Sequence, residues 1–89
     1  MFLVGIDIGK NKHSFCIIEK ETGELIVKPK FFDNNNIGFE ELISSIQNLS
    51  NQDILIGMED TGHYHFALLK FITDHLIQKS SEISLVSAF

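Results

Sequence analysis

Residues 2–9 read FLVGIDIG, a continuous apolar run that contains a single carboxylate, Asp7. The run shows little alternation of apolar and polar residues, which is typical of a strand covered on both faces of a sheet. Burial of a carboxylate in such a strand costs free energy unless the charge is paired with a cation. The first strand therefore predicts both a buried sheet and a functional role for Asp7.

The segments around this strand predict an α/β fold. Further strands are expected at 12–20, 25–32, 54–59 and 83–86, with helices at about 36–49 and 64–78. A polar turn at Gly23 joins the second and third strands into a hairpin, and Pro29 places the third at an edge of the sheet. The order β-β-β-α-β-α-β predicts a mixed sheet in a single domain over residues 1–89, an antiparallel meander followed by parallel strands.

Both helices are predicted from apolar residues at helical spacing. Asn36 is the expected N-cap of the first helix, with Glu40 and Glu41 in its first turn. Its apolar stripe contains Phe39, Leu42, Ile43, Ile46 and Leu49. The stripe of the second helix contains Tyr64, Ala67, Leu68, Phe71, Ile72 and Leu76.

The composition limits the classes of protein to which the chain can belong. The 89 residues are 44% hydrophobic and 21% charged, which is an ordinary globular balance. A formal net charge of −5 argues against a protein that binds nucleic acid by itself. We expect no membrane-spanning helix and no secretory leader, and a single cysteine, Cys16, fits the cytoplasm.

The chain ends in the apolar segment EISLVSAF. We therefore expect these residues to be a fragment of a longer protein. This apolar end and the edge strand that contains Pro29 favour self-association of the fragment. Cys16 is expected to be a small core residue, and the Phe31–Phe32 pair to pack in the core or at the edge of the sheet.

Two strands share a pattern that predicts a metal site. In VGID, Gly5 precedes Asp7 by two residues, and in IGME, Gly57 precedes Glu59 in the same way. Residues two apart lie on one face of a strand, so parallel neighbouring strands would bring both carboxylates together beside two glycines that clear space. Mg²⁺ prefers such oxygen ligands and supports phosphodiester chemistry. In the alternative interpretation Asp7 pairs with Lys10 or Lys12 and Glu59 serves a turn or cap.

The segments VGIDIGKNKHSFCI and GMEDTGHYHFALLKFI resemble the amino-terminal domain of DEDD-type transposases of bacterial insertion sequences. These enzymes have an RNase H-like fold of the Holliday-junction-resolvase (RuvC-like) type. The resemblance covers essentially the whole chain, and the Glu-x-Thr-Gly-x-Tyr element is its more specific part. It implies DNA strand cleavage and transfer during transposition, with Mg²⁺ (or Mn²⁺) as cofactor, DNA as partner and, in some members, a guide RNA.

The resemblance assigns roles to residues. Asp7 and Glu59 correspond to the first two of four metal-binding acids, while the last two, and a serine nucleophile, have no counterpart here. The fragment is therefore expected to be inactive alone. The residues expected around the acids are Lys10, Asp60, Thr61, Gly62 and Tyr64.

Several choices near the second acid stay open. Asp60 could replace Glu59 as ligand, although strand parity favours Glu59, and Asp60 or Thr61 could cap the second helix. Tyr64 could contact substrate or pack in the core. His63 and His65 are two apart and do not share a helix face, which argues against zinc.

Two other function classes compete with the transposase. An actin-like sugar or acetate kinase would need a phosphate-binding loop after the first strand, and KNKHSF is a poor one. A non-catalytic interaction domain would show no metal dependence.

Overall fold

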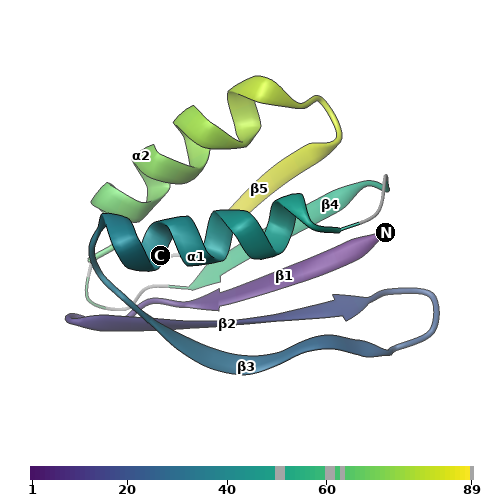
Figure 1. Ribbon diagram of the computed structural model, residues 1–89, viewed down its shortest axis with the longest axis horizontal. Coiled ribbons are helices and arrows are strands. Elements are labelled where there is room, and N and C mark those ends of the chain that lie inside the picture. The colour runs from purple at the N-terminus through teal and green to yellow at the C-terminus, as the bar shows by residue number, and fades with distance from the viewer. Residues whose placement is uncertain (50–51, 60–61, 63, 89) are drawn as a thin grey trace.

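The described residues form five strands and two α-helices (Figure 1). The computed structural model describes residues 1–49, 52–59, 62 and 64–88. The elements are, in order, β1 (Phe2–Asp7), β2 (Lys12–Glu19), β3 (Leu25–Asp33), α1 (Asn36–Gln47), β4 (Ile54–Glu59), α2 (Phe66–His75), the 3-10 helix η1 (Ile77–Lys79) and β5 (Ile83–Ala88). The expected order of strands and helices is confirmed, and η1 is an addition to it.

The strands form one mixed sheet in the order β3-β2-β1-β4-β5. The pairs β1–β2 and β2–β3 are antiparallel, whereas β1–β4 and β4–β5 are parallel. The predicted meander with parallel strands beside it is therefore confirmed. Pro29 lies on the edge strand β3, and Gly23 has a φ of 74° in the turn between β2 and β3, as expected.

Both helices cover the same face of the sheet (Figure 1). Along β1, Val4 and Ile6 point into the core, whereas Gly5 and Asp7 are exposed on the opposite face. The prediction that this strand is covered on both faces is wrong for the described residues. The sequence conceals the alternation because the uncovered positions before Asp7 are also non-polar, namely Leu3 and Gly5. We call this uncovered surface of the sheet the open face.

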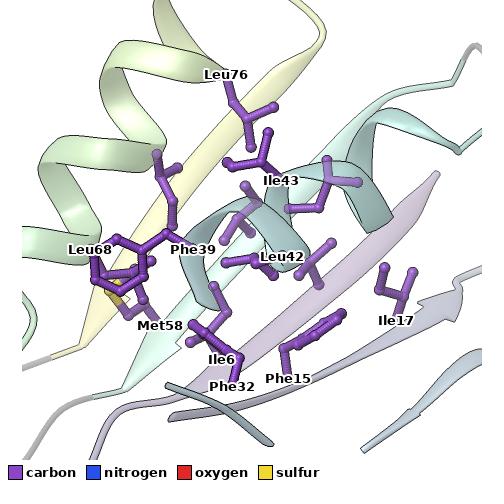
Figure 2. Packing of buried hydrophobic residues seen from close by; sticks show 14 of the residues in the cluster. Ile6, Phe15, Ile17, Phe32, Phe39, Leu42, Ile43, Met58, Leu68 and Leu76 are labelled. Atoms are coloured by element: carbon purple, nitrogen blue, oxygen red, sulfur yellow. The ribbon is translucent and has the colours of Figure 1, made fainter. Parts of the chain in front are cut away.

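The core lies between the helices and the covered face of the sheet (Figure 2). Leu42 and Ile46 of α1, and Leu68 and Ile72 of α2, are almost completely inaccessible to solvent. They pack with strand residues that include Ile6, Phe15, Ile17 and Met58. Among the residues that the structure describes, no helix is long and apolar enough to cross a membrane.

The start of α1 differs from the prediction by one residue. Asn35, not Asn36, is the N-cap, because its backbone is extended and its side chain accepts a hydrogen bond of 2.9 Å from the Gly38 amide. Asn36 is the first helical residue. Glu40 and Glu41 consequently lie beyond the first turn, so the prediction that they interact with the helix N-terminus is wrong.

The second helix is shorter than predicted. α2 begins at Phe66 with His65 in the N-cap position, and it ends at His75 before the separate helix η1. Tyr64 precedes the helix and Ala67 is exposed, so neither belongs to the buried stripe. Leu68, Ile72 and Leu76 are buried as expected.

Candidate functional site

The two predicted acids are direct neighbours on the sheet. In the parallel pairing of β1 with β4, Asp7 is opposite Glu59 and Gly5 is opposite Gly57. Directly opposed residues project from the same face, and both acids are exposed on the open face. The geometric prediction that these strands bring the acids together is confirmed.

The acids lie at one end of a shallow groove of about 540 Å³ on the open face. Gly5 and Gly57 form part of its floor. A Cβ atom would lie 3.7 Å from the Cys16 Sγ atom at Gly5, and 4.0 Å from the Val4 carbonyl oxygen at Gly57. These are ordinary contact distances, so the two glycines leave room on the open face without being required by crowding within the chain.

Neither carboxylate has a positive partner among the described residues. Within the described part of the chain, Asp7 and Glu59 make no ion pair and no side-chain hydrogen bond, and the alternative pairing of Asp7 with Lys10 or Lys12 is not observed. Two adjacent carboxylates repel each other, and a divalent cation would remove this repulsion. The donor set therefore fits a hard cation that completes its coordination with water or phosphate oxygens. Among the described residues, no group of three or more acidic, histidine or cysteine side chains is arranged so that it could hold a metal ion.

The segment after Glu59 is described only in part. Asp60, Thr61 and His63 lie outside the described residues, so the choice between Glu59 and Asp60 as ligand, and the expected caps, are untested there. Tyr64 is 44% exposed and is not a core residue. Its ring lies against Gly62, where a Cβ atom would collide with it. Gly62 and Tyr64 are thus in direct contact.

His65 and Lys10 differ strongly in burial. His65 is only 5% exposed at the N-cap of α2, and its ring contacts that of Phe66. Lys10 is exposed in the turn between β1 and β2, close in sequence to Asp7.

Sequence reasoning missed His13, which holds the turn beside Asp7. Its Nδ1 atom accepts a hydrogen bond of 3.2 Å from the Gly9 amide, so Nε2 carries the proton and donates to Asn34 Oδ1 at 3.0 Å. His13 is 1% exposed. Its position in phase with Phe15 and Ile17 is a signal of burial that the sequence contains, whereas the contact with Asn34 depends on the fold.

Two further expectations about this region need correction. Cys16 is half-buried on the open face and lines the groove, so it is not a core residue. The two phenylalanines of β3 differ, since Phe32 is 3% exposed and Phe31 is 72% exposed. Alternation along the strand sends Phe32 into the core and Phe31 to the open face.

Residues 4–81 match the profile of a family described as "Transposase", the DEDD transposases of the IS110 type. The chain belongs to this transposase family. The match includes both acids, the segment between them and every residue that lines the groove except Val86.

Solved structures show likeness in fold alone. Pelota from Archaeoglobus fulgidus matches with a TM-score of 0.58 and 11% identity over 98% of this chain and 26% of Pelota. The Ppx/GppA phosphatase of Aquifex aeolicus matches with a TM-score of 0.43 and 12% identity over 98% of this chain and 36% of the phosphatase. The transposase chain thus spans only about a quarter to a third of these proteins. No protein of curated function matches the sequence.

Proposed function

We propose that these residues form the first half of a metal-dependent active site that cleaves and transfers DNA strands during transposition. The observation that carries the proposal is the direct register of Asp7 with Glu59 on the open face. Membership of the transposase family supports DNA as the substrate.

Asp7 and Glu59 would hold one Mg²⁺ or Mn²⁺ ion between them. When bound, such an ion supplies positive charge that stabilises the phosphate oxygens of a phosphodiester during cleavage. The two carboxylates would fix the position of the ion relative to the sheet, and the exposed side chain of Lys10 is available to a phosphate of the DNA. Gly5 and Gly57 leave room for the DNA strand to approach the acids.

The remaining parts of the proposal concern the whole protein. We assign the domain to the RNase H-like fold, on the basis of the mixed five-stranded sheet and the position of the acids on β1 and β4. Two more acids and the serine nucleophile would come from residues outside these 89, so this segment alone would not cleave DNA. DNA, and a guide RNA in some members, would bind with the help of those residues in the cytoplasm.

Metal titration of the 89-residue chain tests the site directly. Paramagnetic Mn²⁺ is added to the isotopically labelled protein, and broadening of the backbone amide signals is followed by NMR. We expect the signals near Asp7 and Glu59 to broaden first, because the unpaired electrons act over short distances. Asp7→Asn and Glu59→Gln should each weaken this selective broadening, while Glu41→Gln on α1 should leave it unchanged.

The controls separate a shared site from unspecific attraction to an acidic protein. Glu41 is an exposed carboxylate on the opposite side of the molecule. If broadening is equal at Glu41 and at the acid pair, or if Asp7→Asn has no effect, the chain has no metal site and the interaction-domain alternative is the better description. The kinase alternative is not favoured, because KNKHSF runs into β2 and buries His13 instead of forming a phosphate loop.

A further inference from the structure

The row of residues that contains the two acids continues across the sheet. Asp7 is opposite Ser14 of β2, and Ser14 is opposite Phe31 of β3. The order across the open face is therefore Phe31, Ser14, Asp7, Glu59, with each side chain projecting from the same side. This places a phenylalanine in line with the candidate metal site, two strands away from Asp7.

Phe31 is highly exposed, as Phe66 of α2 also is, but Phe31 lies on the open face in the row that contains the two acids. It is 72% accessible, and within the described residues its ring makes no contact with another aromatic ring. A single exposed aromatic ring is ordinary on a protein surface, so the case for Phe31 rests on its position in the row that contains Asp7 and Glu59. Its neighbour Phe32 already supplies the core with an aromatic side chain from this strand, so packing does not explain Phe31.

The polar groups near Phe31 define the chemistry of that ligand. Ser14 supplies a hydroxyl group between the ring and Asp7, and the acid pair is suited to a cation-bound phosphate. Lys12 begins β2 on the same face as Ser14, one row farther along the sheet, and it is exposed without an ion pair among the described residues. A hydroxyl group and a lysine ammonium group, the latter opposite the Asp33 carboxylate, therefore lie beside a flat apolar ring. This combination matches a nucleotide, whose phosphate is anionic and whose base has a π-face.

The base must be unpaired to use this ring. Bases in a duplex are already stacked on their neighbours, and an extruded or single-stranded base exposes its face to an aromatic side chain. Two interstrand steps separate Phe31 from Asp7, which is about 10 Å between their Cα atoms. A nucleotide close to the phosphate at the acid pair can span this separation.

We propose that Phe31 is a stacking platform for an unpaired base of the DNA strand whose phosphate lies at Asp7 and Glu59. The inference rests on the proposed function, and it adds a substrate-binding residue outside the metal site. It also specifies single-stranded or locally opened DNA as the form that this face binds.

A tryptophan substitution tests stacking directly. The natural chain contains no tryptophan, so Phe31→Trp introduces a single fluorophore at the proposed platform. A short single-stranded thymidine oligonucleotide is titrated with excess Mg²⁺, which screens the repulsion between DNA and a chain of net charge −5. We expect strong quenching of the Phe31→Trp emission, because a stacked base quenches indole. Leu25→Trp is the matched control, since Leu25 is also exposed but lies at the other end of β3. Its emission should change little.

Affinity measurements then separate stacking from simple apolar contact. We expect Phe31→Leu to weaken oligonucleotide binding about fivefold or more, whereas Phe31→Tyr should retain it, because only an aromatic ring stacks on a base. Equal affinity of Phe31→Leu and the natural chain, or equal quenching of the two tryptophan variants, would overturn the proposal. If Phe31→Leu instead reduces self-association and leaves DNA binding unchanged, the ring is a protein contact and the proposal is also wrong.

The two proposals fail in different ways. Manganese broadening at Asp7 and Glu59 tests the metal site without DNA, and Phe31→Leu should leave it intact. Selective broadening combined with unchanged oligonucleotide affinity of Phe31→Leu would reject the platform and keep the active site. Absence of broadening combined with quenching of Phe31→Trp would reject the metal site and keep only the stacking of a base on Phe31, without a phosphate at the two acids.

Discussion

At the scale of single residues, His13 links three segments that surround the candidate site. Its two ring nitrogens connect the turn after β1, through Gly9, with the loop before α1, through Asn34. The ring also packs near Phe32 and Phe39, with centroid distances of 5.2 and 6.3 Å. Because both nitrogens are used, the neutral tautomer with the proton on Nε2 is fixed by the fold.

Replacement of His13 by leucine should destabilise the protein. Leucine keeps most of the buried volume but leaves the Gly9 amide and the Asn34 side chain without their partner, and we expect a loss of about 2 kcal/mol in the free energy of unfolding. Urea denaturation measures this value. The control is His75→Leu, because His75 is exposed on the last turn of α2 and, among the described residues, its hydrogen bond and ring contact are both with Phe71 of the same helix. Similar losses for both variants would contradict the linking role of His13.

Gly9 determines how tightly the turn beside Asp7 can close. A Cβ atom at this position would collide with the carbonyl oxygen of Lys12. Gly9→Ala should therefore open the turn and lower the free energy of unfolding by about 1–3 kcal/mol. Gly57→Ala is the matched control on the neighbouring strand, since its Cβ has open space and alanine suits a strand better than glycine. The measurement is urea unfolding of both variants. Equal changes in the free energy of unfolding for Gly9→Ala and Gly57→Ala would contradict this interpretation.

At the scale of elements, the start of α1 offers a test of a one-residue difference between sequence and structure. Three successive asparagines occupy 34–36, and each is a suitable cap by residue type. Asn35 is extended and its side chain reaches the Gly38 amide, whereas Asn36 is already the first helical residue. Asn34 is instead bound to His13.

Alanine substitutions should distinguish the two candidate caps. Asn35→Ala removes the hydrogen bond to Gly38 and should cost about 1 kcal/mol of stability. Asn36→Ala places a strong helix former at the first helical position and should be neutral or slightly stabilising. Denaturation curves of the two variants provide the measurement. A larger loss of unfolding free energy for Asn36→Ala would mean that Asn36, the residue predicted from the sequence, is the N-cap.

Some elements could be predicted closely from the sequence, and the reasons are physical. β4 has the predicted bounds 54–59, because a short, mainly apolar run follows the polar segment that ends at Asp53. The start of α2 was placed too early, because Tyr64 continues the helical spacing although its ring lies on Gly62. The juxtaposition of Asp7 with Glu59 was predictable from strand parity once β1 and β4 were taken as parallel neighbours. The alignment of Phe31 with Asp7 could not be predicted, because it depends on the register of two antiparallel strand pairs.

At the scale of the whole molecule, the open face is the main departure from the sequence-based expectation. It presents exposed or half-buried residues of neighbouring strands, including Leu3, Ile18, Leu55 and Val86 around a second, almost wholly apolar groove of about 360 Å³. The opposite face holds the entire cluster of buried core residues. The stability of the chain should therefore depend on one face of the sheet far more than on the other.

Two adjacent residues of β4 provide the test of this asymmetry. Ile56 points into the core with no exposed surface, whereas Leu55 lies half-buried on the open face. Ile56→Ala should lower the free energy of unfolding by about 3 kcal/mol or more, since it removes a buried side chain and leaves a cavity. Leu55→Ala should cost about 1 kcal/mol or less, because its side chain is already partly hydrated. Both are measured by urea denaturation at a low and a high protein concentration. If Ile56→Ala and Leu55→Ala lower the free energy of unfolding equally, at either concentration, the sheet is not covered on one face only. If the loss for Leu55→Ala grows with protein concentration, a second copy covers the open face.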